Sequence, residues 1–334
     1  MPGIRSATAT AAGTELPTNA SNAGRRRLQI YLPIADLPVN IFLIFGMGLA
    51  VGFISGMFGI GGGFLMTPLL IFTGISPAVA VATVTSHIAA SSFTGAINYW
   101  RKRAVDISLA LMLLAAGIVG TAAGVWVFTM LRAVDQLDLV IGLSYVSLLT
   151  TVGALMINEG IQAELRARRG GPGMLRRPGS HTFIHGLPLK MRFKRSKIYV
   201  SVIPVWGIGF MIGFIGAVLG IGGGFLLVPM LIYFLRVPTA TVIGTSMVMT
   251  LITMTSATVM HAATNHLVDA ILALILMVGG VIGAQFGAHT GQRMRAERLR
   301  LLLGLLVFVV GLRFCYELVV KPTELYSIRM VGFD

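Results

Sequence analysis

The stretch "GIGGGFLMTP" at residues 59–68 returns almost unchanged as "GIGGGFLLVP" at residues 220–229. Glycine reaches backbone conformations that are closed to other residues, and runs of glycine disfavour a continuous helix. Both clusters lie in apolar sequence, and a short apolar segment follows each of them, at 64–74 and at 225–236. The repetition indicates a chain that is broken at two related points inside a largely apolar protein.

The composition is that of a membrane protein. Of the 334 residues, 55% are hydrophobic and 11% are charged, and the mean hydropathy is +0.85. Soluble domains carry about 25% charged residues, and a helix that crosses a bilayer needs about 20 apolar ones. The net charge of +14 is concentrated in tails and loops, as membrane orientation requires, so we expect a lipid bilayer as partner and no nucleic acid. We predict an all-α polytopic membrane protein.

The two halves of the chain repeat the same landmarks in the same order. The matched residues are Pro68 with Pro229, Pro77 with Pro238, Thr85-Ser86 with Thr245-Ser246 after a one-residue slip, Asn98 with His261, and Asp106 with Asp269. Such an ordered set indicates an internal duplication. Many secondary transporters consist of two homologous halves that hold the substrate between them, near the middle of the membrane.

The repeats and the charged segments divide the chain into five regions. We predict a disordered, basic-ended tail at 1–39, transmembrane repeat 1 at 40–158, a basic cytoplasmic loop at 159–197, transmembrane repeat 2 at 198–320 and a C-terminal tail at 321–334. We expect about four transmembrane helices and one short half-helix in each repeat, or about 8–10 crossings in all.

The number of crossings depends on the short segments. If they do not cross the membrane, each half has four crossings; if they do, each half has five and the halves are inverted. Eleven helical residues rise only about 16 Å, roughly half the hydrocarbon thickness, which favours eight full spans and two half-helices. Counting the basic residues of the loops does not separate the two schemes.

The glycine clusters predict a binding site for a small anion. A helix that begins after a break presents free N–H groups and the positive end of its dipole, which together attract an anion without a formal charge. We expect such half-helices to start at Phe64 and Phe225, and hydroxyl groups on the following segments to add ligands. The predicted substrate-binding residues are Gly61, Gly62, Gly63, Phe64, Thr85, Ser86, Gly222, Gly223, Gly224, Phe225, Thr245 and Ser246.

Close packing of helices is the alternative function of a glycine. It is the interpretation that we favour for Gly120, Gly124, Gly283 and Gly287, which follow the spacing of small-residue contacts between membrane helices. Packing alone does not need three consecutive glycines followed by a short segment, so the two clusters keep the binding interpretation.

A few other polar residues of the apolar segments are candidates for contact with the substrate or for coupling to a proton or cation. They are His87, Asn98, His261, Asp106 and Asp269. For each histidine the alternative is a hydrogen bond between helices, because an imidazole is both donor and acceptor. For each aspartate we favour an N-cap, in which the carboxylate lies at the positive end of a helix.

The sequence does not indicate an enzyme. It contains no recognisable nucleophile–base pair, no paired carboxylates and no metal-ligand spacing, so we expect no catalytic residues, no metal and no cofactor. Its single cysteine, Cys315, excludes an internal disulfide framework. The favoured function is a secondary transporter whose halves rock around an anion bound between the half-helices. A passive anion channel with the same site is the alternative.

The motifs "GMFGIGGGFLMTPLL", "AVLGIGGGFLLVPMLIY" and "VIGTSMV" resemble those of the TauE/SafE family of sulfite-exporter-like membrane proteins, also described as sulfonate uptake permeases. The resemblance implies a multi-pass protein of the bacterial inner membrane that transports sulfite, sulfonates or related small anions. Direction and substrate differ among members, so neither is implied for this chain. The Gly-Thr-Ser form of the family occurs only at 244–246, whereas Val84 stands at the corresponding place in the first half, which implies an asymmetric site.

Overall fold

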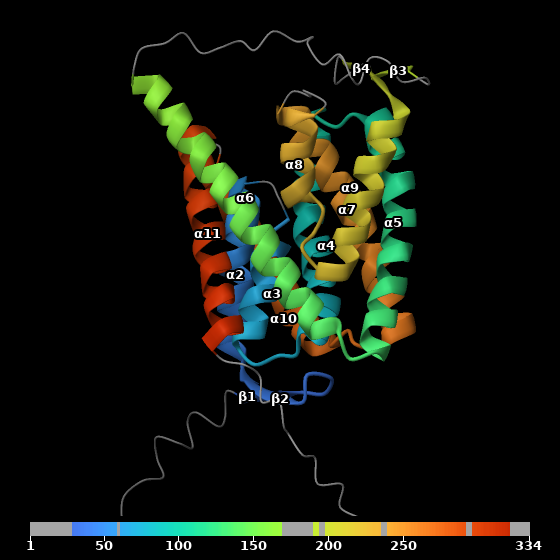
Figure 1. Cartoon of the computed structure of the whole chain (residues 1–334), viewed down its shortest axis with the longest axis vertical. Helices are drawn as coiled ribbons and strands as arrows, with labels where there is room; N and C mark the ends of the chain where they lie inside the picture. The colour runs from blue at the N-terminus through green and yellow to red at the C-terminus, as the bar shows by residue number, and fades with distance from the viewer. Residues whose placement is uncertain are drawn as a thin grey trace, which may run out of the picture.

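The computed structural model describes residues 29–58, 61–168, 190–193, 198–234, 239–291 and 296–320. These residues form a bundle of helices with a short β-hairpin at each end (Figure 1). The helices are α2 (Ile41–Phe58), α3 (Gly63–Phe72), α4 (Pro77–Arg101), α5 (Ile107–Ala133), α6 (Leu137–Arg168), α7 (Val202–Leu219), α8 (Gly224–Tyr233), α9 (Thr239–Met260), the π-helix η2 (His261–Asn265), α10 (Ala270–Gly291) and α11 (Ala296–Val320). The hairpins are β1 (Gln29–Leu32) with β2 (Leu37–Asn40), and β3 (Lys190–Phe193) with β4 (Ile198–Ser201).

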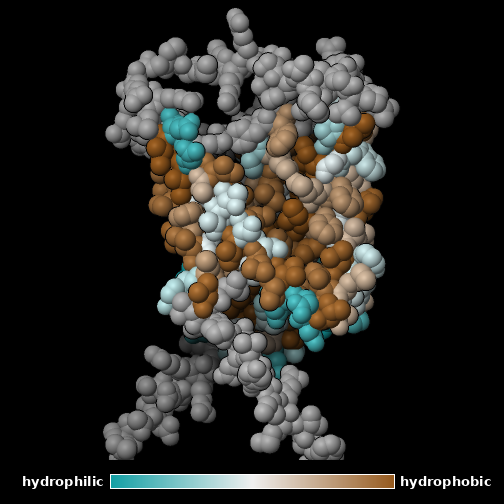
Figure 2. Space-filling model, in the orientation of Figure 1, coloured by the Kyte–Doolittle hydropathy of each residue, from teal (hydrophilic) through white to brown (hydrophobic). Residues whose placement is uncertain are grey.

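The outer surface of the bundle is apolar. Within the described chain, α2, α5, α6, α7, α9 and α10 are the 6 helices that are long and apolar enough to cross a membrane. Large side chains such as Trp126, Phe286 and Val319 are more than half exposed on them and on α11. Figure 2 shows this surface, on the face turned to the viewer, as a broad apolar band. Because water would not tolerate so large an exposed apolar area, the predicted polytopic membrane protein is confirmed.

Glycines hold two pairs of parallel helices in close contact. A Cβ atom on Gly52 of α2 would lie 2.3 Å from the carbonyl oxygen of Gly280 on α10. On the other side of the bundle, a Cβ atom on Gly120 of α5 would lie 2.1 Å from the carbonyl oxygen of Phe210 on α7. Main chains approach this closely only where side chains are absent. Gly124, Gly283 and Gly287 make the same kind of contact, so the packing predicted for these glycines agrees with the structure.

Helices α4 and α9 cross in the centre of the bundle and run antiparallel. The hydroxyl groups of Thr85 and Thr258 are 2.8 Å apart at one end of this contact. Further along α4, a Cβ atom on Gly95 would lie 2.9 Å from the sulfur of Met247, near the start of α9. These two helices carry most of the buried polar residues, because their surroundings are protein and not lipid.

The short helices reverse the direction of the chain. Gly62, at the start of α3, lies against Val51 and Ser55 of α2, whereas Gly74, just beyond the end of α3, faces Leu37, which precedes α2. Helix α3 therefore returns to the end of the bundle from which α2 started, and α8 does the same at the opposite end (Figure 1). A ten-residue helix rises about 15 Å, which suffices for a return from mid-bundle. This chain path corrects our preference for four passes in each half, because each half begins and ends at opposite ends of the bundle, as in the inverted alternative.

The structure also changes two of the predicted boundaries. Strands β1 and β2 occupy residues 29–40, most of which we had assigned to the disordered tail, and Leu32 is completely buried. The main-chain N–H of Ile34 in the intervening turn donates to Asp269 Oδ2 at 3.1 Å, which fastens the hairpin to α10. Helix α6 continues to Arg168, within the predicted loop. Residues 1–28, 169–189 and 321–334 lie outside the described residues.

Candidate functional site

The chain turns sharply at the first glycine cluster. Gly61 and Gly62 have φ angles of +86° and +67°, in the left-handed region that other residues rarely adopt. Helix α3 then begins at Gly63, one residue before the predicted start, with Gly62 as its N-cap. The first N–H groups of any helix lack acceptors within the helix, so the turn leaves these donors facing the interior of the bundle.

The second cluster turns in the same manner. Gly220 and Gly222 have φ angles of +64° and +74°, and Gly220 ends α7 with its N–H bonded to the carbonyl of Gly216 at 2.9 Å. Helix α8 begins at Gly224, again one residue earlier than predicted, with Gly223 as its N-cap. Both α3 and α8 are ten residues long and run away from their breaks toward opposite ends of the bundle (Figure 1).

The two breaks touch each other. A Cβ atom on Gly63 would lie 2.6 Å from the carbonyl oxygen of Ile221 and 2.8 Å from that of Gly220. The rings of Phe64 and Phe225, the second residues of the two short helices, stack with their centroids 4.5 Å apart. The N-terminal ends of α3 and α8 therefore meet at one place, and their positive dipole ends act on the same small volume.

Two hydroxyl groups donate hydrogen bonds to carbonyl oxygens at the C-terminal end of α7. Tyr145 of α6 donates to the carbonyl of Leu219 at 2.6 Å, and Thr67 of α3 donates to the carbonyl of Gly220 at 3.2 Å. Tyr145 and Thr67 are both completely buried. Because these acceptors receive hydroxyl donors, the negative end of α7 opposes the positive ends of the short helices less strongly.

Two further hydroxyl groups at the breaks have no partner. Ser92 of α4 and Thr250 of α9 are 0% and 1% exposed, and neither Oγ nor Oγ1 has a hydrogen-bond partner. The position that a Cβ atom on Gly61 would take lies 3.6 Å from Ser92 Oγ and 3.6 Å from the methyl group of Thr250. The Thr250 hydroxyl oxygen lies 3.6 Å from the position that a Cβ atom on Gly223 would take. A buried hydroxyl without a partner is costly, which marks this point as a place for a ligand.

Apolar side chains close the remaining sides of this volume. Ile88, one turn before Ser92 on the same face of α4, comes within 3.4 Å of the Cβ position on Gly61 and 2.8 Å of that on Gly222. Together with the stacked rings of Phe64 and Phe225, it lines the space beside both breaks. We name the volume bounded by the breaks, Ser92, Thr250, Ile88 and the two rings the central site.

The four hydroxyl residues predicted from the sequence all take part in other hydrogen bonds. Thr85 donates to the carbonyl of Ala82 at 2.7 Å, Ser86 to that of Thr83 at 2.6 Å, and Ser246 to that of Ile243 at 2.9 Å. Thr245 accepts a hydrogen bond from the main-chain N–H of Asp106 at 3.2 Å. Ser92 and Thr250 were not singled out, because an unmatched hydroxyl is recognisable only when its neighbours are known.

Thr83 and Thr245 reveal how the halves correspond. The Thr83 hydroxyl accepts from the main-chain N–H of Asp269 at 3.1 Å, which repeats the bond from Asp106 to Thr245. Thr245 therefore corresponds to Thr83 and not to Thr85. The one-residue shift between the two halves runs in the opposite direction to the shift that we assumed. The match also brings Ile88 and Thr250 to corresponding positions, where one half supplies an apolar side chain and the other a hydroxyl group.

Asp106 and Asp269 cap helices. Asp106 Oδ1 accepts from the N–H of Leu109 at 3.3 Å, at the start of α5. Asp269 Oδ1 accepts from the N–H groups of Ile271 and Leu272 at 3.1 and 3.0 Å, at the start of α10. Carboxylates in this position stabilise a helix through hydrogen bonds and the dipole. The geometry thus favours the N-cap interpretation of both residues.

Replacing Asp269 with alanine is expected to lower the stability of the protein. The substitution removes acceptors for the N–H groups of Ile34, Ile271 and Leu272, and loss of an N-cap costs about 0.5–2 kcal/mol. The measurement is the melting temperature of the detergent-purified protein. Asp269→Asn retains Oδ1 as an acceptor and should lose less; equal melting temperatures for the wild-type protein and Asp269→Ala would contradict the capping role.

The three remaining candidates do not line the central site. His87 is buried against α10, where its Nδ1 donates to the carbonyl of Leu276 at 2.8 Å and its Nε2 has no partner. His261 is buried in η2 and is bonded through Nε2 to the carbonyl of Ala217 at 3.1 Å. Asn98 is exposed near the end of α4, so the structure does not bring it together with His261 as a matched pair.

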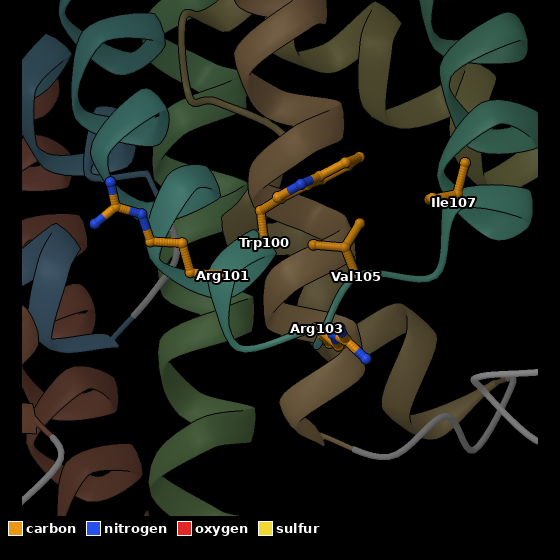
Figure 3. A pocket seen from close by; sticks show the side chains of 5 residues that line it. All are labelled: Trp100, Arg101, Arg103, Val105 and Ile107. Atoms are coloured by element: carbon orange, nitrogen blue, oxygen red, sulfur yellow. The ribbon is translucent and has the colours of Figure 1, made fainter.

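A hollow of about 250 Å³ opens at the end of α4, away from the central site. Trp100, Arg101, Arg103, Val105 and Ile107 line it. Figure 3 shows the Arg101 side chain extending away from the indole of Trp100, so polar groups do not converge on one point. Because Trp100 is two helical turns beyond Ser92, or about 12 Å, this surface hollow is not part of the central site. Among the described residues, no group of three metal-ligating side chains is found.

Comparisons with known proteins agree with the resemblance noted in the sequence. The profile of the family described as "Sulfite exporter TauE/SafE" matches residues 44–314. The "Probable membrane transporter protein YjnA" of Bacillus subtilis (strain 168) is 26% identical over 83% of this chain and 99% of its own length. A "Probable membrane transporter protein" of Xylella fastidiosa (strain 9a5c) is 30% identical over 82% of this chain and 94% of its own length.

More distant similarity extends to plants. The "Sulfite exporter TauE/SafE family protein 3" of Arabidopsis thaliana is 27% identical over 33% of this chain and 24% of its own length. No solved structure matches the chain. The helices, their apolar outer surface and these relatives together define a multi-pass membrane transporter and not an enzyme. The chain belongs to the TauE/SafE family, as its glycine motifs predicted.

Proposed function

We propose that this protein is a secondary transporter that carries a small anion, such as sulfite or a sulfonate, through the central site. The observation that carries the proposal is the pair of buried hydroxyl groups without partners, on Ser92 and Thr250, where two helix N-termini meet. Hydroxyl and N–H donors can bind an oxyanion while leaving no fixed charge that would prevent its release. The name of the family supports sulfite and related anions as the first substrates to test.

The arrangement of the helices supports alternating access by two inverted repeats. The first helix of each half packs along the fourth helix of the other: α2 on α10, and α7 on α5. The third helices, α4 and α9, cross antiparallel beside the breaks. Each half thus contributes one break and one central helix to the site, so rocking of the halves would open it to either side in turn.

The packing of the central site supports a carrier over a channel. Phe64, Phe225, Ser92, Thr250 and Ile88 are all at most 2% exposed. An open pore would leave at least part of this lining accessible to water. A carrier accelerates the exchange of labelled for unlabelled substrate when substrate is present on the far side of the membrane, and a pore does not, so counterflow in proteoliposomes distinguishes them.

The ends of the bundle indicate an orientation in the inner membrane. Arg101, Lys102 and Arg103 lie at the end of the bundle at which α6 ends and α7 begins (Figure 1). The sequence between those two helices adds most of the ten Lys and Arg residues of 159–197. Since cytoplasmic loops carry the excess of basic residues, we assign this end to the cytoplasm and the β1–β2 hairpin to the opposite side.

The expected result of replacing Ser92 with alanine or Thr250 with valine is a loss of transport without a loss of stability. A hydrogen bond to a charged group contributes about 1.5–3 kcal/mol, which corresponds to roughly tenfold to a hundredfold in exchange rate for each variant. The melting temperature should stay the same or rise, because the variant removes a buried polar atom without a partner. Counterflow of labelled sulfite and the melting temperature are measured on the same preparations.

Neighbouring residues provide matched controls. Ser91 and Thr253 are as deeply buried on the same helices, but they donate to the carbonyl groups of Ile88 and Met249. Ser91→Ala and Thr253→Val should therefore retain transport. Equal loss in the controls, or full activity in Ser92→Ala and Thr250→Val, would remove the central site from the transport path.

A further inference from the structure

We infer that the central site selects anions with a single negative charge and rejects those with two. This inference rests on the proposed function and specifies the charge state of the substrate. Its basis is the electrostatic balance of the described residues around the breaks, which supplies at most about one compensating charge.

The positive potential of the site comes from main-chain dipoles. The N-terminal ends of α3 and α8 meet where the rings of Phe64 and Phe225 stack at 4.5 Å. Each helix N-terminus is equivalent to about half a positive charge, so the two together provide at most about one, because α2 and α7 end at the same breaks with dipole ends of the opposite sign. The hydroxyl groups of Tyr145 and Thr67 donate to the nearby carbonyl oxygens of Leu219 and Gly220, which weakens the opposing potential of these oxygens.

Among the residues whose side chains the structure describes, no cationic side chain adds to this positive potential. All the Lys and Arg residues among them are exposed: Arg101, Lys102, Arg103, Arg132 and Arg313. The buried carboxylates of Asp106 and Asp269 accept hydrogen bonds at the starts of α5 and α10, beyond the central site. Ser92 and Thr250 add hydrogen-bond donors but no charge.

A second negative charge in this site would remain unbalanced. The cost of moving an ion into a medium of low dielectric constant rises with the square of its charge, and an uncompensated buried charge is strongly unfavourable. The apolar wall formed by Ile88, Phe64 and Phe225 offers a second anionic oxygen no donor. The apolar character of this wall suits a small carbon substituent, as in a methyl sulfonate. The site therefore fits bisulfite better than sulfite dianion, and a monosulfonate better than sulfate.

The test compares two ligands of nearly the same shape. Methanesulfonate keeps one negative charge across the pH range, whereas methylphosphonate passes from one charge to two near neutral pH. Each ligand is titrated against counterflow of labelled sulfite by the intact protein in proteoliposomes, on the acid and the alkaline side of that ionisation. Binding of the same ligands to the purified protein, followed by its melting temperature, gives a second readout.

The expected result is that methylphosphonate inhibits about as well as methanesulfonate at acid pH and at least about tenfold less at alkaline pH. Methanesulfonate should inhibit equally at both, once the change in labelled bisulfite is taken into account. Thr250→Val should weaken binding of methanesulfonate, and Thr253→Val should not.

The outcomes separate the inference from the function on which it rests. If methylphosphonate dianion binds as well as the monoanion, selection of charge state is wrong while anion transport stands. If sulfite is not exchanged and none of these anions alters the melting temperature, both the proposed function and this inference are overturned.

Discussion

Replacing Gly63 with alanine is expected to abolish anion exchange. The new Cβ atom would lie 2.2 Å from Ile88 Cδ1, 2.6 Å from the carbonyl oxygen of Ile221 and 2.8 Å from that of Gly220. The isoleucine side chain can turn aside, but the two carbonyl groups belong to the main chain of the second break, so the breaks must separate. A displacement of about 1 Å in a binding group can reduce a rate by about a hundredfold, and we expect at least that loss.

A matched control and a stability measurement accompany this variant. Gly207 of α7 has no atom within 4 Å of its Cβ position, so Gly207→Ala should leave exchange unchanged. Counterflow is compared after each protein is shown to be monodisperse in detergent. Wild-type exchange by a well-folded Gly63→Ala would show that contact between the two breaks is not needed for transport.

Replacing Gly283 with valine is expected to prevent the protein from folding. Its Cβ atom would lie 2.1 Å from the carbonyl oxygen of Leu49 and 2.7 Å from the main-chain nitrogen of Phe53, both in α2. Helices α2 and α10 would have to move apart along the whole contact that includes Gly52 and Gly280. Overpacking of an interior usually costs about 1–3 kcal/mol, and a clash between two main chains should exceed that range.

The readouts for Gly283→Val are the yield of monodisperse protein and its melting temperature. Gly46→Val, on the lipid-facing side of α2, introduces the same side chain where nothing lies within 4 Å and should behave as the wild-type protein. A Gly283→Val protein with wild-type yield and melting temperature would contradict close contact between α2 and α10.

The roles of the glycines show which of these effects can be read from sequence. Runs of glycine between apolar segments predicted both breaks, because backbone freedom is a property of the residue itself. The structure has α3 and α8 beginning within one residue of the predicted positions. The spacing of Gly120, Gly124, Gly283 and Gly287 likewise indicated close helix packing, although the sequence could not say which helix each would face.

The roles of the hydroxyl groups, by contrast, could not be predicted from the sequence. Thr85, Ser86 and Thr245 recur near the breaks in sequence, yet their hydroxyl groups are bonded to main-chain or side-chain partners. Ser92 and Thr250 looked no different from other polar residues of α4 and α9. Whether a hydroxyl has a partner depends on the atoms that surround it, and here those atoms come from both halves of the chain.

The sequence by itself determined that this chain is a polytopic membrane protein of the TauE/SafE family, broken at two glycine clusters. These features follow from composition and from residue-specific backbone preferences, which act locally. Only the tertiary structure decided that the breaks touch, that Ser92 and Thr250 face them, and that α3 and α8 turn the chain back. Those outcomes depend on contacts between segments far apart in the chain, whose geometry no local pattern specifies.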